Sequence, residues 1–273
     1  MRQFTENLHE SIFFTCKRQK DSGGFGATPR LPATVEDTYH ALRIVDAVER
    51  YCGLPSNISI HKDRHKKFLL GLVESKSNLE MKGRYQLIWC LNWCGVQDIT
   101  TELTHALVTD ELPGKSPEVF FYFLRVVRIL GLDVKSLFQV EQIVPLVSFE
   151  GIMFRRWVAI FINEATGSKV LDNAFAARWI LACQNYDGGF GFLPGSTSYI
   201  ENTYYALKAL SVLGYPVRVP IDVAKYLIGC QTGSGGFSRK AGAAPFLDST
   251  WYGTSALIYL QAALEEFPQG RYS

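Results

Sequence analysis

The sequence predicts an all-α fold in which six helical hairpins form two concentric rings, an α/α toroid, as a single domain over residues 1–273. Three observations lead to this prediction. A segment of about 24 residues recurs along the chain, its clear C-terminal copies are spaced like helix pairs, and amphipathic helices alternate with helices that are apolar on every face.

The repeat is clearest at residues 19–42, 184–207 and 231–254. In each copy a Gly-Gly-Phe turn is followed, 15 residues after its first glycine, by a threonine: Thr38, Thr203 or Thr250. An acidic residue stands two positions before that threonine and an aromatic residue directly after it. Gly188 and Gly235 are 47 residues apart, a length that suits two helices with their loops.

In chain order, the first clear copy is followed by three degenerate units that lack the Gly-Gly-Phe turn. Their inner helices are expected within residues 85–95, 117–131 and 153–163, and residues 119–124 of the second are apolar on every side. The two remaining clear copies complete the ring. Between them an amphipathic outer helix is expected, with its apolar side chains at helical spacing: Ile221, Ala224, Leu227 and Ile228.

Composition excludes several classes of protein. The chain is 47% hydrophobic and 20% charged, which is too apolar for a disordered chain, and its net charge of +2 does not indicate nucleic-acid binding. No uninterrupted apolar run is long enough to span a membrane, and the N-terminus carries no secretory signal. The six cysteines show no Cys-x-x-Cys spacing, so we expect reduced thiols in a cytoplasmic protein.

The Gly-Gly-Phe-Gly segment, followed by an acid-x-Thr-aromatic helix start, resembles the repeat shared by protein prenyltransferase β-subunits and squalene-type terpene cyclases. This resemblance implies that the inner-helix N-termini surround the mouth of a central aromatic cavity that holds an apolar, isoprenoid-like ligand. The residues that it places on or near the wall of this cavity are Tyr39, His40, Trp89, Tyr204, Tyr205, Trp251 and Tyr252.

The residues that hold zinc in protein prenyltransferases are not matched here. The family uses Asp-x-Cys at one inner-helix start and a histidine at the next, whereas this chain has Glu201, Thr203 and Ser249 at those positions. Hydroxyl groups are poor zinc ligands. We therefore expect no metal and no other cofactor.

Terpene cyclases of the squalene type start carbocation chemistry with an Asp-x-Asp-Asp acid, and this chain has no such segment. The candidate acids are Glu36, Asp37 and Asp248, which stand at predicted helix starts. A helix N-terminus stabilises the ionised carboxylate, which opposes proton donation. The alternative is that these side chains only cap their helices.

Arginines in the predicted inner helices need an anionic partner if they are buried. Arg155, with Arg156, Arg125 and Arg128, is therefore a candidate for contact with a substrate diphosphate. The alternative is that they pair with acidic side chains.

The leading functional hypothesis is a zinc-free, isoprenoid-handling enzyme related to terpene cyclases and prenyltransferases. One alternative is a zinc-dependent prenyltransferase β-like subunit with a helical partner subunit. Another is a non-catalytic toroid that binds a lipid or a protein.

Overall fold

The structure is a computed structural model that describes residues 4–53, 55–56, 58, 61–75, 79–96, 117–129, 131, 153–167 and 171–267. These residues form ten α-helices and no strand, only isolated β-bridges. The inner helices are α2 (Val35–Cys52), α5 (Met81–Trp93), α7 (Pro117–Ile129), α9 (Met153–Thr166), α11 (Ile200–Leu213) and α13 (Leu247–Glu266). The outer helices are α1 (Thr5–Cys16), α4 (Lys62–Glu74), α10 (Asn173–Ala182) and α12 (Pro220–Cys230).

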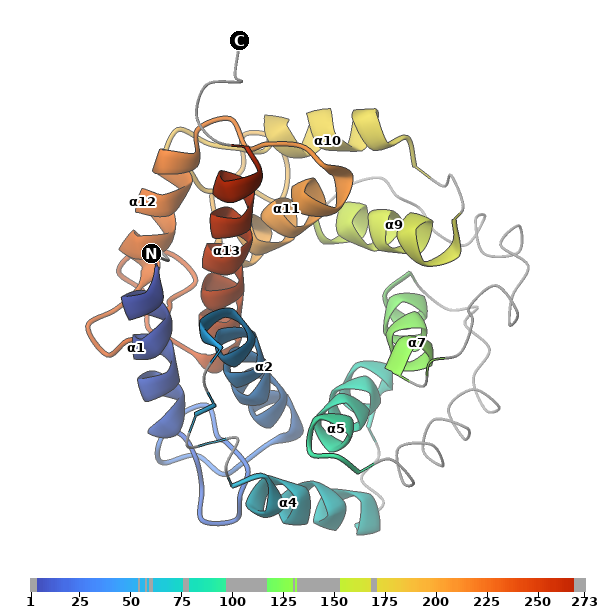
Figure 1. Cartoon of the computed structure of the whole chain (residues 1–273), viewed down its shortest axis with the longest axis vertical. Helices are drawn as coiled ribbons and strands as arrows, with labels where there is room; N and C mark the ends of the chain where they lie inside the picture. The colour runs from blue at the N-terminus through green and yellow to red at the C-terminus, as the bar shows by residue number, and fades with distance from the viewer. Residues whose placement is uncertain are drawn as a thin grey trace.

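The inner helices surround a central axis, and the outer helices lie behind them (Figure 1). Each inner helix contacts the next in chain order, and α13 contacts α2, so the inner ring closes. The predicted α/α toroid is confirmed. The two further outer helices that six hairpins require fall outside the described residues, and the single domain over residues 1–273 stays a prediction.

The repeated threonine joins each Gly-Gly-Phe turn to its inner helix. The hydroxyl oxygens of Thr38, Thr203 and Thr250 each accept a hydrogen bond of 3.0 Å from the backbone N–H of the turn phenylalanine. The phenylalanine side chains are completely buried. This one contact, made three times, explains why glycine, phenylalanine and threonine recur together.

The first glycine of each turn packs against the outer helix of the following hairpin. Gly235 has a φ of 90°, and a Cβ there would lie 2.4 Å from the carbonyl oxygen of Glu10 in α1. Asn7 of α1 also donates to Gln231 at 2.6 Å and accepts from it at 2.9 Å. The last repeat therefore contacts the first helix and closes the ring. This contact requires glycine at position 235, because a side chain there would clash with the backbone of α1.

The buried face of α12 agrees with the sequence prediction at Ala224 and Leu227 but not at the two isoleucines. Val223, Leu227 and Cys230 are buried, whereas Ile221 and Ile228 are 52% and 45% exposed. The helical period was correct, but the apolar residues around this helix cover more than one face. The packing of α12 on α13 decides which of them are buried.

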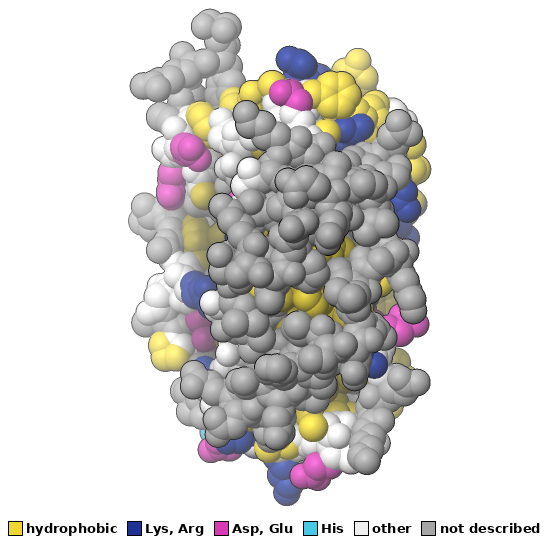
Figure 2. Space-filling model, turned by 90° about the vertical axis from the view of Figure 1, so that its right-hand side faces the viewer, with side chains coloured by type: hydrophobic (Ala, Val, Ile, Leu, Met, Phe, Trp, Pro, Cys, Tyr) yellow, Lys and Arg dark blue, Asp and Glu magenta, His cyan; other side chains and the backbone are white. Residues whose placement is uncertain are grey.

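The surface agrees with the balanced composition. Lysine and arginine side chains mix with acidic ones around the described part of the face seen in Figure 2. All six cysteines are free thiols. None of the described helices combines the length and the hydrophobicity that a membrane span requires.

Candidate functional site

Inside the inner ring, each inner helix contributes one aromatic side chain from its N-terminal half to a common layer. All are at most 5% exposed. This aromatic layer consists of Tyr39, Tyr85, Phe121, Trp157, Tyr204 and Trp251. Tyr39 and Tyr85 meet through their hydroxyl groups at 3.3 Å, and the rings of Tyr204 and Trp251 lie 5.1 Å apart. These contacts place the N-terminal halves of the inner helices at the same end of the barrel.

One helical turn further along each inner helix, a second layer carries three cations. The six residues, each four positions after its aromatic partner, are Arg43, Trp89, Arg125, Phe161, Lys208 and Ser255. We call this the cation-bearing layer. Its cations stand on α2, α7 and α11, which are alternate helices of the ring.

Each of these cations lies near two rings of the aromatic layer, one on its own helix and one on the preceding inner helix. The guanidinium of Arg125 is 4.4 Å from the ring centre of Tyr85 and 5.4 Å from that of Phe121. The Lys208 ammonium nitrogen, Nζ, is likewise 4.4 Å from the ring centre of Trp157 and 5.4 Å from that of Tyr204.

The guanidinium of Arg43 follows the same rule with Tyr39 and Trp251, at 5.9 and 5.4 Å. Cation–π contacts therefore position all three charges. Arg43 also lies 4.9 Å from the ring centre of Trp89 on α5.

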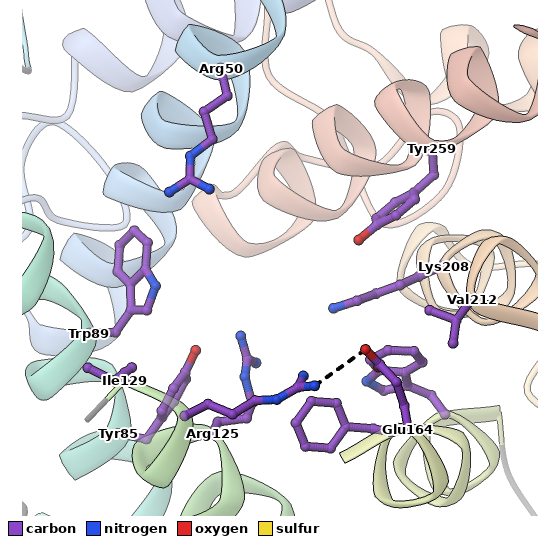
Figure 3. Close-up of a pocket in the computed structure, with 12 residues that line it drawn as sticks. Arg50, Tyr85, Trp89, Arg125, Ile129, Glu164, Lys208, Val212 and Tyr259 are labelled. Carbon is purple, nitrogen blue, oxygen red and sulfur yellow. Dashed lines mark hydrogen bonds and ion pairs between the residues drawn. The ribbon is translucent and has the colours of Figure 1, made fainter. Parts of the chain in front are cut away.

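A cavity of about 560 Å³ lies at this level, toward the C-terminal ends of the inner helices. Figure 3 shows Lys208 and Arg125 pointing into it, together with Tyr85, Trp89 and Tyr259. A neighbouring pocket, which includes Arg43 and Ser255, shares Arg50 and Tyr259 with it.

The cations at the rim of this cavity have carboxylate partners. Arg50 pairs with Asp46 at 2.9 Å and Arg128 with Glu164 at 3.3 Å. In contrast, no carboxylate among the described residues pairs with the three cations of the deeper layer. The interior thus carries an excess of positive charge.

The amine of Lys208 is perturbed by this environment. Its Nζ donates a hydrogen bond of 3.1 Å to the hydroxyl of Tyr204. Burial, with repulsion from Arg125 and Arg43, holds the pKa of Lys208 well below its usual value.

The predicted wall residues come together, but only one of them lines the described cavity. Tyr39, Tyr204 and Trp251 belong to the aromatic layer, and Trp89 faces the cavity. The others fill the spaces between inner helices: His40, Tyr205 and Tyr252. His40 stacks on Trp251 with ring centres 5.5 Å apart, and burial lowers its pKa to about 3, so the imidazole is neutral.

The three candidate acids lie at the opposite end of the inner helices from this cavity. Glu36 is exposed and pairs with Lys82 at 2.6 Å, and Asp248 is exposed and accepts hydrogen bonds from Ser249. Asp37 is half-buried, and its carboxylate accepts a bond of 2.7 Å from the Thr34 hydroxyl.

Burial raises the pKa of Asp37, against the opposing effect of the Thr34 hydrogen bond. None of the three acids lines the cavity.

The nominated arginines divide into two pairs. Arg125 and Arg128 line the cavity, as described. Arg155 instead pairs with Glu118 of α7 at 3.5 Å, and the Arg156 guanidinium lies 4.7 Å from the ring centre of Trp179 in the outer helix α10.

Comparison with known proteins agrees with this architecture. The model of the family described as "Prenyltransferase alpha-alpha toroid domain" matches residues 2–96, 151–223 and 198–271, which together are well over half of the chain. The chain belongs to this family.

Two curated proteins share short segments with this chain. The β subunit of geranylgeranyl transferase type-1 from Arabidopsis thaliana is 49% identical over 45 residues, which are 16% of this chain and 12% of that protein. The β subunit of geranylgeranyl transferase type-2 from Candida albicans is 33% identical over 73 residues, 24% of this chain and 21% of that protein. The matches therefore span about a fifth or less of either relative.

Solved structures match the toroid over its full length. The apo type II terpene cyclase MstE from Scytonema superposes with a TM-score of 0.63 and 10% identity, covering 97% of this chain and 99% of that one. A variant of the same protein, in complex with geranylgeranyl dihydroxybenzoate as its substrate, superposes with a TM-score of 0.62, 10% identity and coverage of 97% and 98%. At this identity the likeness shows the fold alone.

The residues at the zinc-ligand positions of the toroid family do not fit a zinc site. Thr203 uses its hydroxyl to accept from Phe190 and to donate to the Tyr199 carbonyl, and Ser249 donates to Asp248. The Thr203 hydroxyl is therefore hydrogen-bonded to the local backbone, and the Ser249 hydroxyl to the adjacent carboxylate. The absence of a cofactor stays a prediction.

Sequence reasoning missed Arg43, Lys208 and the aromatic residues Tyr85, Phe121 and Trp157 as site residues. One signal was present: Arg43 and Lys208 each stand five residues after a repeat threonine, so they occupy equivalent positions of two clear copies. The three missed aromatics lie in the degenerate units, where no Gly-Gly-Phe turn sets the register.

Proposed function

We propose that this toroid is a zinc-free, isoprenoid-handling enzyme whose apolar ligand occupies the central cavity beside the aromatic layer. The observation that carries the proposal is the aromatic layer itself, to which all six inner helices contribute a buried ring. A long unsaturated hydrocarbon gains free energy by leaving water for such a surface. The names of the curated relatives and of the MstE complex support an isoprenoid as ligand.

The same rings suit carbocation chemistry. The negative face of an aromatic ring attracts a cation, and rings that are already held in place stabilise developing positive charge without reorganising. Trp89 and Phe161 add ring surface on the walls of the cavity. Exclusion of water by these apolar groups would protect a reactive cation from hydrolysis.

The test combines binding with product analysis. The purified chain is titrated with geranylgeraniol, geranylgeranyl diphosphate and squalene while tryptophan fluorescence is followed, because Trp89 and Trp157 line the cavity and Trp251 lies in the aromatic layer beside it. Mass spectrometry of the same mixtures reports turnover. We expect at least one isoprenoid to bind and to be consumed. Failure of all three to bind would refute the proposal, and binding without consumption would favour a lipid-binding toroid.

An acid-initiated reaction is the second candidate. It would require the isoprenoid to bind at the N-terminal end of the inner helices, opposite the cavity, where burial raises the pKa of Asp37. An acid with a raised pKa keeps its proton closer to neutral pH and can donate it to an alkene. The change Asp37→Asn, compared with the exposed acids in Glu36→Gln and Asp248→Asn, tests this assignment. Loss of product in the Asp37 variant alone, with isoprenoid binding retained, would support it.

A helical partner subunit is a further proposal, supported by the names of the curated relatives, which are both β subunits. Co-expression with an α-type helical subunit followed by size-exclusion chromatography tests it. A complex of the two chains would support the proposal, and two separate peaks would contradict it.

A further inference from the structure

The cation-bearing layer has an arrangement that the proposed binding of a hydrocarbon does not require. Arg43, Arg125 and Lys208 come from alternate inner helices at equivalent positions of the ring. Arg125 and Lys208 line the cavity, and Arg43 lines the neighbouring pocket, which shares Arg50 and Tyr259 with the cavity. None of them has a carboxylate partner among the described residues. Three like charges at one level repel each other, so the fold keeps them together at a cost in stability.

The polar atoms of this layer also have unused hydrogen-bonding capacity. The Nε–H of Arg43 and the indole N–H of Trp157 are buried and find no hydrogen-bond partner among the described residues. A buried donor without a partner is unfavourable. Trp157 lines the cavity together with Arg125 and Lys208, and Arg43 lines the neighbouring pocket.

We propose that Arg43, Arg125 and Lys208 form an anion site for a phosphate or diphosphate group. The two guanidinium groups remain charged at any pH a protein experiences, and they offer fork-shaped sets of donors that suit phosphate oxygens. Lys208 is the one cation of the three that can give up its charge to reduce the repulsion.

The surroundings of Lys208 fit this assignment. The charged or titratable groups that face it from the neighbouring elements are Arg43 and Arg50 on α2, Tyr85 on α5, Arg125 and Arg128 on α7, Glu164 on α9 and Tyr259 on α13. Glu164 is the only carboxylate in that set, and it is paired with Arg128. No carboxylate among the described residues forms an ion pair with Lys208. Burial and repulsion from Arg125 and Arg43 lower the pKa of Lys208 more than attraction to Glu164 raises it.

Binding of an anion reverses that balance. A phosphate oxygen beside Nζ stabilises the ammonium, so the pKa of Lys208 rises on binding, and protons are taken up from solvent at any pH where the free amine is partly deprotonated. Between the pKa of the free site and that of the occupied site, affinity for the anion then falls by up to tenfold for each unit of rising pH. Below the lower pKa the affinity no longer depends on this group.

The inference rests on the proposed function in one respect: the anionic group would belong to a bound isoprenoid. The test of the anion site is independent of that function. Inorganic pyrophosphate has no hydrocarbon tail, and geranylgeraniol has no anionic head. Calorimetric titration of the purified chain with pyrophosphate between pH 6 and 9.5 reports on the anion site alone. Titration with geranylgeraniol reports on the apolar part alone.

Three variants separate the two parts of the proposal. Arg125→Met and Lys208→Met should each weaken pyrophosphate binding at least tenfold at pH 7. Lys208→Arg keeps the charge and removes the titration, so its affinity should follow only the ionisation of pyrophosphate itself. Lys240→Met changes an exposed lysine outside the cavity and should leave both affinity and pH dependence unchanged.

The outcomes are distinct. No binding of pyrophosphate, or equal binding by the wild type and the two methionine variants, overturns the anion site while leaving the isoprenoid proposal standing. Identical pH profiles for the wild type and Lys208→Arg overturn the coupling of Lys208 protonation to anion binding.

Competitive acetylation of the free protein, read by mass spectrometry at Lys208, measures that amine directly. Its apparent pKa should lie more than one unit below the ordinary lysine value of about 10.4 and should rise when pyrophosphate is present. An ordinary value in the free protein would contradict the proposal.

Discussion

Replacing Arg125 by methionine should separate ligand binding from stability. The unbranched methionine side chain keeps the apolar contacts of the arginine stem over Tyr85 and Phe121 and removes the charge. A hydrogen bond to a charged group contributes about 1.5–3 kcal/mol, and 1.4 kcal/mol corresponds to a factor of ten. We therefore expect the affinity for pyrophosphate or for a prenyl diphosphate to fall about 10- to 100-fold.

The free energy of unfolding should respond differently. Loss of the cation–π contacts costs about 1 kcal/mol, but removal of Arg125 also relieves its repulsion of Arg43 and Lys208. These two effects have opposite signs. We therefore expect the free energy of unfolding without ligand to change by less than about 1 kcal/mol in either direction.

Calorimetric titration measures the affinity, and urea unfolding at pH 7 measures the stability. Arg178→Met is the matched control, because Arg178 is exposed on the outer helix α10, and it should change neither quantity. A fall in stability of about 3 kcal/mol or more, with affinity unchanged, would show that Arg125 has a structural role, as expected when a paired buried charge loses its partner, and would refute this reasoning.

Three further predictions concern the fold. Thr250→Val removes the acceptor of the Phe237 N–H and should lower the free energy of unfolding by about 1–3 kcal/mol in urea; a change below 0.5 would contradict the role of the repeat threonine. Gly235→Ala forces a side chain onto a backbone with φ of 90° and should cost at least about 1 kcal/mol, whereas Gly233→Ala, with nothing nearby, should be close to neutral. The pKa of His40 is about 3 in the folded protein and about 6.5 in the unfolded chain. Between pH 6.5 and pH 3 the unfolded chain therefore binds one more proton at His40 than the folded protein does. The free energy of unfolding should fall over this range by up to about 1.4 kcal/mol for each pH unit of acidification. His40→Gln should make that acid-side loss shallower, and an unchanged slope would count against a neutral, buried imidazole.

The toroid could be predicted from the sequence because the repeat encodes a local contact. Glycine, phenylalanine and threonine recur at fixed spacing since one backbone turn, one buried ring and one hydroxyl acceptor must meet in every copy. Contact of Gly235 with α1 then closes the ring. The degenerate units keep the inner helices but lack the turn, so their register was not visible.

The position of the cavity could not be predicted in the same way. The sequence places aromatic residues on inner helices, but whether a ring fills the barrel or lines an open space depends on packing across the axis from six helices. Tyr39 and Tyr204 were expected on or near the wall of the ligand cavity: Tyr204 lines the neighbouring pocket, and Tyr39 lies in the aromatic layer but lines neither described pocket. The sequence indicates the cation-bearing layer only when two clear copies of the repeat are aligned, because Arg43 and Lys208 then occupy equivalent positions.

The most direct test of the account is a crystal structure of the protein bound to a non-hydrolysable prenyl diphosphate analogue. We expect the diphosphate between Arg43, Arg125 and Lys208, with the hydrocarbon against the cavity rings. A head group found instead at the opposite end of the inner helices, near Glu36 and Asp248, would contradict the assignment of the site to the cation-bearing layer.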